Sequence, residues 1–148
     1  MNFRLLLLVM LLFAIGCSDL INESELESKR GLLYNPKNSK PYSGKVYKLY
    51  STGSKMREGV FDLGAIDGSY TYYDNEGSII NPIEENMLDL KDGKKYFPGT
   101  DKEYWGLAYG LYQTGETSYE VFYEGGKLSS EYTYFKLDGS VKDPIFMS

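Results

Sequence analysis

The sequence predicts an all-β protein: tandemly duplicated antiparallel β-hairpins forming an elongated, twisted sheet. Three observations support this class: a gapless self-match, short aromatic segments typical of strands, and glycines that close the turns between them. At a shift of 62 residues, Gly31 to Ile79 aligns with Gly93 to Val141, and 18 of 49 positions are identical. Self-similarity at a fixed period is the signature of a repeat architecture.

Each half repeats again at a shift of 24 residues. Glycines, with one serine in place of the expected glycine, mark this shorter period: Gly44 falls on Gly68, Gly53 on Gly77, Gly106 on Ser130 and Gly115 on Gly139. The shared unit contains an aromatic segment followed by Gly or Ser at a fixed place. We therefore expect four hairpin units, two in each half.

The strands are predicted where Tyr, Phe and β-branched residues are concentrated. "KVYKLY" (45–50) and "SYTYY" (69–73) are such segments, with return strands at 54–61 and 116–123. Aromatic and β-branched residues suit a pleated, half-buried surface. The turns "STG", "DNEG", "QTG" and "LDG" each end in glycine, which adopts the left-handed conformation that closes a bulged hairpin.

Residues 81–92 are predicted to connect halves at 31–80 and 93–141, and residues 142–148 to form a tail. An alternative for 81–90 is a helix, because Asn81 and Pro82 suit a helix start. The 62-residue shift instead aligns this segment with 19–28. A connector that repeats with its half is the preferred interpretation.

Residues 1–16 are predicted to be a lipoprotein signal peptide. They contain Arg4 and an unbroken apolar run of eleven residues from Leu5 to Ile15, whereas a membrane-spanning helix needs roughly 20. The ending "FAIGCS" resembles the lipobox of bacterial lipoproteins, which implies acylation of Cys17 and a lipidated tether over 17–30. An ordinary signal peptide followed by an unrelated cysteine is the alternative.

This resemblance implies a protein of the bacterial cell envelope, anchored to the membrane through Cys17. Ser18 rather than Asp follows the cysteine, so in a host with two membranes we expect the outer one, with the protein on its periplasmic or outer surface. More than one acyl chain is needed for stable anchoring.

Composition excludes several functions. The chain has no histidine and a single cysteine, which excludes His-based catalysis, the usual His/Cys zinc sites and an intrachain disulfide. Without residues 1–16, 15 basic and 21 acidic residues remain, a net charge of −6. An acidic surface repels nucleic acid. We expect no enzyme activity, no metal and no cofactor.

The segment "PYSGKVYKLYSTGSKMREGVFDLGAIDGSYTYYDNEGSI" resembles the MORN-repeat variant of bacterial envelope proteins, which includes chains labelled as YwqK-family antitoxins. The resemblance covers residues 31 to 141. It implies hairpins laid side by side, a role in protein interaction or assembly, and no common catalysis. Ser130 and residues 81–105 depart from the repeat, so two short hairpin arrays joined in the middle are an alternative to one continuous sheet.

Aromatic residues are the candidate binding residues, because a single sheet cannot bury aromatics on both faces. The candidates are Tyr50, Tyr73, Trp105, Tyr112 and Tyr119. The alternative for each is ordinary packing, since aromatics dominate core energetics. Glu58 and Glu120 recur at equivalent places, and we expect both on a solvated face.

The sequence thus predicts a non-catalytic, membrane-anchored repeat scaffold that binds another envelope protein. Two alternatives remain: an antitoxin or immunity-like protein that neutralises a toxin at the envelope, and a glycan-binding protein that uses rows of aromatic residues.

Overall fold

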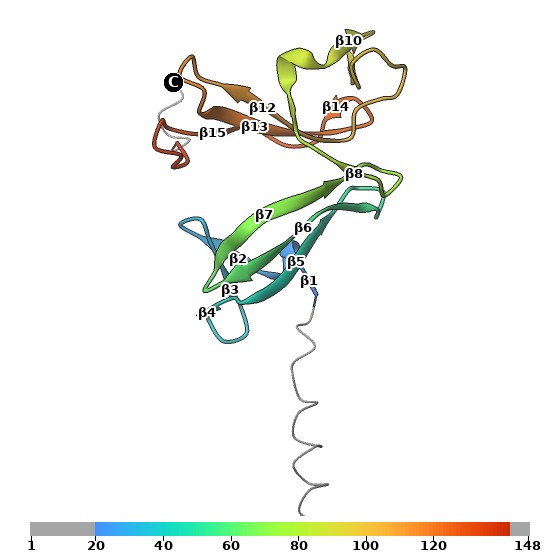
Figure 1. The fold of residues 1–148 in the computed structure, drawn as a ribbon. Coiled ribbons are helices and arrows are strands. Elements are labelled where there is room, and N and C mark those ends of the chain that lie inside the picture. Colours follow the sequence, from blue (N-terminus) through green and yellow to red (C-terminus); the bar gives the residue numbers. More distant parts are fainter. Residues whose placement is uncertain (1–19, 143–148) are drawn as a thin grey trace, which may run out of the picture.

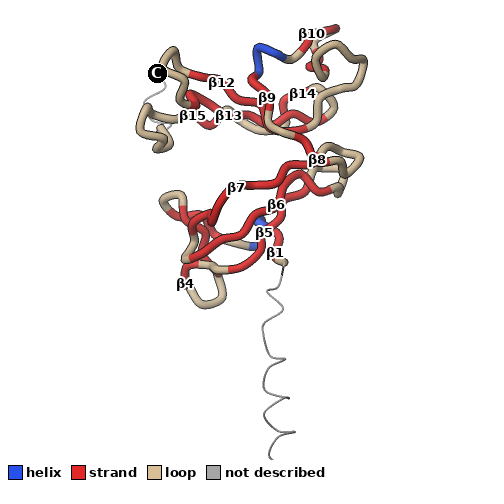
Figure 2. The backbone as a smooth tube through the Cα atoms, in the orientation of Figure 1, coloured by secondary structure: helices blue, strands red, loops and turns tan. Residues whose placement is uncertain are grey.

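The structure is a computed structural model that describes residues 20–142. Strands form most of this range, and its helical elements are two short 3₁₀ turns (Figure 2). Figure 1 shows the two halves of the chain stacked one above the other, each with its own sheet. The predicted all-β class of tandem antiparallel hairpins is confirmed, as two stacked arrays rather than one continuous sheet. The predictions for residues 1–16, for Cys17 and for 143–148 lie outside the described residues.

The first half contains eight strands and one 3₁₀ turn, in the order β1 (Ile21–Asn22), η1 (Glu23–Glu25), β2 (Glu27–Lys29), β3 (Leu32–Asn35), β4 (Lys40–Pro41), β5 (Gly44–Leu49), β6 (Lys55–Asp62), β7 (Ala65–Tyr73) and β8 (Ile79–Ile80). The second half contains seven strands and one such turn, in the order β9 (Ile83–Glu84), η2 (Glu85–Met87), β10 (Asp89–Lys91), β11 (Lys94–Tyr96), β12 (Gly106–Leu111), β13 (Thr117–Glu124), β14 (Lys127–Leu128) and β15 (Thr133–Tyr134).

Both halves have the same topology. The first main sheet has the order β1-β5-β6-β7-β8, and the second has β9-β12-β13-β14, with β15 also paired to β13. In each half the long strands form antiparallel hairpins, while the short first strand pairs in parallel, β1 with β5 and β9 with β12. Small separate sheets, β2-β3-β4 and β10-β11, complete the halves.

Glycines at the ends of the four predicted turns adopt the left-handed conformation: φ is +87° at Gly53, +85° at Gly77, +99° at Gly115 and +81° at Gly139. The register of each first hairpin shifts by one residue near its turn, at Lys48/Leu49 and at Gly110/Leu111. These are the expected bulged hairpins. An L-residue is strained at such φ values, so the turn chemistry fixes the register of each hairpin.

Gly64 joins the small sheet of the first half to its main sheet. Its carbonyl accepts from the backbone N–H of Leu33 at 2.8 Å, and its own N–H donates to the carbonyl of Tyr42 at 2.8 Å. A Cβ on Gly64 would lie 2.8 Å from the Leu33 carbonyl oxygen. Gly126 makes the equivalent contacts in the second half. The duplicated glycine is therefore required by a close backbone approach.

The connector predicted at 81–92 is part of the second half. It contains β9, η2 and β10, and residues 21–29 fold in the same way as β1, η1 and β2. The α-helix alternative is wrong, and so is the extended tether over 17–30, because β1 begins at Ile21. The connector does repeat with its half. The duplicated unit begins near Ile21 and Ile83 rather than at Gly31 and Gly93, because the parallel pairing of the first strand draws this segment into the fold.

Each half has its own hydrophobic core, in which buried residues of the main sheet pack with buried residues from the segments that precede it. The first core contains Leu33, Tyr42, Val46 and Phe61, and the second contains Leu88, Tyr104, Ala108, Val121 and Tyr123. Ile21 and Leu26 pack against the first core and Ile83 against the second. Burial of these side chains is the main stabilising contribution in each half.

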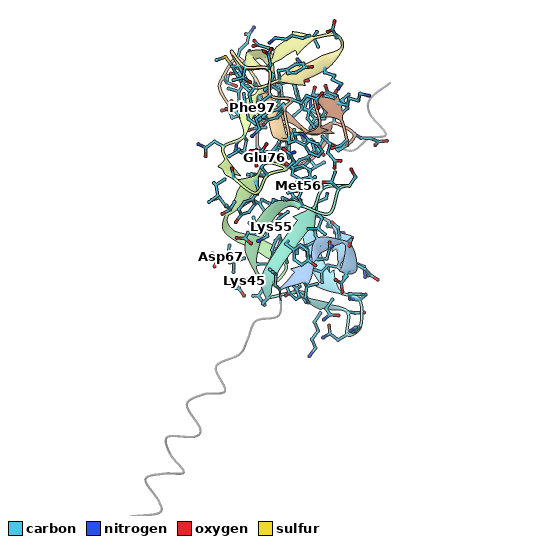
Figure 3. The ribbon with its side chains drawn as sticks, turned by 90° about the vertical axis from the view of Figure 1, so that its right-hand side faces the viewer. Lys45, Lys55, Met56, Asp67, Glu76 and Phe97 are labelled. Atoms are coloured by element: carbon cyan, nitrogen blue, oxygen red, sulfur yellow. The ribbon has the colours of Figure 1, made fainter. Side chains whose placement is uncertain are left out.

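The halves meet through aromatic and charged contacts. The rings of Tyr50 and Trp105 lie 5.2 Å apart in an edge-to-face arrangement. Lys102 donates to the buried carboxylate of Asp74 at 2.8 Å and to Glu76 at 3.3 Å, and Figure 3 shows Glu76 at the level where the halves meet. Trp105 has Ser43 as its equivalent in the first half, so the two halves use different surfaces in this contact.

Candidate functional site

The aromatic residues predicted to bind a partner are separated, and each already has an intramolecular contact. Tyr50 is buried, donates its hydroxyl to the carbonyl of Tyr73 at 2.6 Å, and contacts Trp105. Tyr112 makes the equivalent bond to the carbonyl of Phe135 at 2.6 Å. Tyr50 and Tyr112 therefore tie the same two strands together in each half, and Trp105 lies at the junction between the halves.

The two remaining candidates each bind a glutamate. Tyr73 donates to Glu58 at 2.6 Å, and Tyr119 donates to Glu85 at 2.8 Å. Both tyrosines are half-buried. The structure therefore brings Tyr50 together with the ring of Trp105 and with the backbone of Tyr73, whereas Tyr112 and Tyr119 have other partners, Phe135 and Glu85.

Glu85 is the centre of a polar cluster that the sequence did not predict. Its carboxylate lies on η2 and accepts hydroxyl hydrogen bonds from Tyr119, from Tyr132 at 3.0 Å, and from the buried Tyr123. Burial alone would raise the pKa of Glu85, but the three hydroxyls together outweigh it and lower the pKa. The carboxylate therefore stays ionised with neutral donors around it.

Glu23 occupies the equivalent position on η1 and has a different partner. Arg57, the equivalent of Tyr119, donates through Nη2 to both oxygens of Glu23 at 2.9 Å. The guanidinium also lies 4.2 Å from the ring centroid of Tyr70 and 5.4 Å from that of Phe122 in the other half. Glu23 and Glu85 coincide at the 62-residue shift, and extending the self-match upstream to Ile21 would have revealed the pair.

Glu58 and Glu120, the repeated acids of the long strands, also differ in their surroundings. Lys55 donates to Glu58 at 2.7 Å and Tyr73 at 2.6 Å, and these two donors lower the pKa of Glu58. The backbone of Glu120 pairs with Tyr109 and Thr133 in the sheet, but its carboxylate has no hydrogen bond or ion pair with any residue that the structure describes. Burial raises the pKa of Glu120, and the charge of Arg57 acts in the opposite direction. Both Glu58 and Glu120 are half-buried, so the predicted solvated face is only partly solvated at each position; the Glu58 side chain is 36% exposed.

The free edge of β7 is the longest open strand edge of the first sheet. β8 pairs only with Tyr72 and Tyr73, so within residues 20–142 the outer edge of 65–71 has no partner strand. A cavity of about 480 Å³ runs along this edge, and Ile66, Tyr70, Ile79 and Pro82 are among its lining residues. Ile66 and Ile79 are exposed. In the second half the same stretch is broken into β14 and β15.

Residues 20–142 contain no group of three or more His, Cys, Asp or Glu side chains placed to hold a metal ion. No helix in this range is long and apolar enough to span a membrane.

Comparison of the chain with protein-family models, with curated proteins and with solved structures finds no match. The likeness to MORN repeats therefore stays a prediction, and a function for this chain rests on the geometry of its two halves.

Proposed function

We propose that this protein is a non-catalytic binding module of the bacterial envelope, which takes an extended segment of a protein partner along the free edge of β7. The observation that supports it is the open edge at 65–71 beside a cavity lined by Ile66 and Ile79. Backbone N–H and C=O groups of an open edge pair with a partner strand, and neighbouring pockets then select its side chains. Seven residues span about 23 Å at roughly 3.3 Å each.

The second half provides a matched control for this surface. Leu128 and Val141 are the equivalents of Ile66 and Ile79, and both are exposed as well. The second half, however, lacks a continuous edge strand at this place. We expect Ile66→Lys with Ile79→Lys to weaken partner binding at least about tenfold, because lysines at an edge oppose strand pairing. Leu128→Lys with Val141→Lys is expected to leave binding unchanged.

The experiment is photo-crosslinking in native envelopes, with the crosslinker at Ser69 on β7 or at Ser43, which lies beside the β6–β7 turn rather than on the open edge. Recovery of one protein from Ser69, lost in the Ile66/Ile79 lysine variant, is the expected result. Equal recovery from both positions, or none from Ser69, would contradict the proposal. Crosslinking of Ser69 to a second copy of this chain would replace the foreign partner with self-association.

Membrane anchoring through Cys17 is a separate part of the proposal. β1 begins four residues after Cys17, so the folded domain lies within about 14 Å of an acylated terminus at roughly 3.3–3.6 Å per residue. We expect metabolic labelling with a fatty-acid analogue to mark the wild-type chain and to fail in Cys17→Ser. Labelling that persists in this variant would contradict the anchor and leave the β7 proposal untouched.

A further inference from the structure

Lys55 occupies a small cation site in the first half. Its Nζ donates to Glu58 at 2.7 Å and lies 5.1 Å from the ring centroid of Tyr73. Tyr73 in turn donates its hydroxyl to Glu58. The ammonium is thus held by a carboxylate and by the face of an aromatic ring, the two groups that recognise such a cation in proteins.

The second half keeps this site but lacks its cation. Glu120 is the equivalent of Glu58, Phe135 of Tyr73, and Thr117 of Lys55. The shorter Thr117 carries no charge, and Phe135 has no hydroxyl to donate. Within residues 20–142 neither an ion pair nor a hydrogen bond satisfies the Glu120 carboxylate. An open cavity of about 570 Å³ lies here, lined by Thr117, Glu120 and Phe135.

The surroundings of the cavity favour a cation over an anion. Glu116 and Asp138 line it together with Glu120, so three carboxylates contribute negative potential. Lys136 acts on Asp138 but is not among the lining residues. Arg57 is the cation that acts on Glu120, and its guanidinium is paired with Glu23. Lys142 is directed elsewhere, with Nζ 5.4 Å from the ring centroid of Tyr112. Residues 1–19 and 143–148 contain no lysine.

We propose that the cavity at Thr117, Glu120 and Phe135 binds an alkylammonium group from outside the chain: a lysine side chain of a protein or a small free amine. The first half shows the geometry that this ligand adopts, with its nitrogen on the glutamate and its charge over the ring. The cavity is large enough for the four-carbon chain of a lysine as well as its ammonium. The residues that line this cavity all belong to the second half, and none of them lines the cavity along the β7 edge.

The test is an NMR titration of the full chain, isotopically labelled, with Nα-acetyl-lysine methylamide. We expect shifts at Thr117 and Phe135, and none with the matched ligand whose Nε is acetylated, because that ligand is neutral. Glu120→Gln and Thr117→Lys are both expected to weaken binding at least about tenfold. The first removes the carboxylate charge, and the second supplies an internal ammonium like that of Lys55.

Lys55→Thr provides the reciprocal variant. It empties the site of the first half, and we expect new shifts around Tyr73 and Glu58 on titration with the same ligand.

Absence of shifts in the wild-type chain, or binding unchanged in Glu120→Gln, would overturn the proposal. A lysine-containing peptide that binds at least about tenfold more tightly than butylamine identifies a protein ligand, and equal affinity identifies a free amine. The Ile66/Ile79 lysine variant is expected to bind the ammonium normally, so failure of one proposal is distinguishable from failure of the other.

Discussion

Glu23 and Glu85 sit at the same place in two copies of one fold, yet they are satisfied in different ways. Glu23 faces the guanidinium of Arg57, whereas Glu85 faces the hydroxyls of Tyr119, Tyr123 and Tyr132. Phe61 is the first-half equivalent of Tyr123, so the first half has an apolar ring where the second half has a hydroxyl donor. A partly buried carboxylate needs partners, and either one charged donor or three neutral ones supply them.

The location of the two acids accounts for the difference. Arg57 lies against the other half, where its guanidinium faces Phe122 and acts on Glu120. Among residues 20–142, Tyr119 has no neighbour from the other half and contacts the rings of Tyr132 and Tyr134 within its own half. The copies therefore diverged where one half touches the other, and the supporting contacts inside each half changed with them.

The largest effect is expected for Glu23→Ala. The side chains of Glu23 and Arg57 are only 21% and 13% exposed, so this variant leaves an uncompensated, nearly buried guanidinium. We expect a loss of about 3 kcal/mol in the free energy of unfolding. Glu85→Ala leaves only neutral hydroxyls unpaired and should cost about 2 kcal/mol. Urea denaturation measures both, and a larger loss in Glu85→Ala would reverse the proposed hierarchy.

Trp105→Ser gives the second half the residue that the first half has at this position. It removes the edge-to-face contact with the buried Tyr50, and we expect the free energy of unfolding to fall by about 2 kcal/mol. The reciprocal Ser43→Trp adds a ring at an exposed position and removes the hydroxyl that accepts from the backbone N–H of Leu63 at 2.8 Å, so it should cost about 1 kcal/mol. Thermal denaturation of both variants compares them, and equal losses would argue against a junction role for Trp105.

Lys102→Ala removes the ion pair with Asp74, and Lys40→Ala, at the exposed equivalent position, is its control. We expect a loss of about 1 kcal/mol for the first and none for the second. Burial would raise the pKa of Asp74, but Lys102 and the backbone N–H groups of Ser78 and Glu76 lower it. The ionised Asp74 therefore contributes its full stabilisation of the folded state above pH 3.8, and this contribution is lost as the pH falls further. The difference between wild type and Lys102→Ala should shrink as the pH falls, and urea midpoints across this range measure it.

The smallest effect, which is measured from the pH dependence of stability in alkali, concerns Tyr119. Burial and then the bond to Glu85 raise its pKa from 10.0 to about 12. Because the folded state favours the protonated phenol, its contribution is complete below pH 10 and is lost as the pH rises towards 12. We expect Tyr119→Phe to lose less stability than wild type over this interval. An unchanged slope, measured by urea midpoints with phenolate absorbance, would remove Tyr119 from the cluster.

The sequence predicted the hairpins well because their signals are local. Gly53 and Gly115 mark turns that depend on backbone conformation alone, and the aromatic runs around them mark strands. The strands β1 and β9 were not predicted. Each has only two residues, which is too short to show an alternating sequence pattern, and each pairs in parallel with a strand far along the chain, β5 or β12. From the sequence, the two-sheet arrangement was an alternative to one continuous sheet, because the stacking of the two sheets depends on contacts between residues far apart in the chain.

The site residues were harder to predict than the fold. Tyr73 and Glu58 lie on different strands, and alternation within each strand does not reveal that the two are bonded. The contact of Glu85 with Tyr119 spans 34 residues, and no local pattern predicts it. Trp105 was singled out because it differs from Ser43, and the difference does mark a contact, one that lies within the chain.

The junction between the halves also limits how far the repeat can extend. The two halves meet through different surfaces, and a contact of that kind generates an open chain of units unless something ends it. A further copy added after the second half in the same geometry would not reproduce the contacts of this junction. Its Lys40 would face Lys136, whereas Lys102 faces Asp74 in the present junction. It would also have Ser43 in the place of Trp105 and Val60 in the place of Phe122. Terminal units of repeat proteins carry altered outer faces for the same reason. The residues by which the copies differ therefore fit the first half to the second, and they do not fit a third copy in the same geometry.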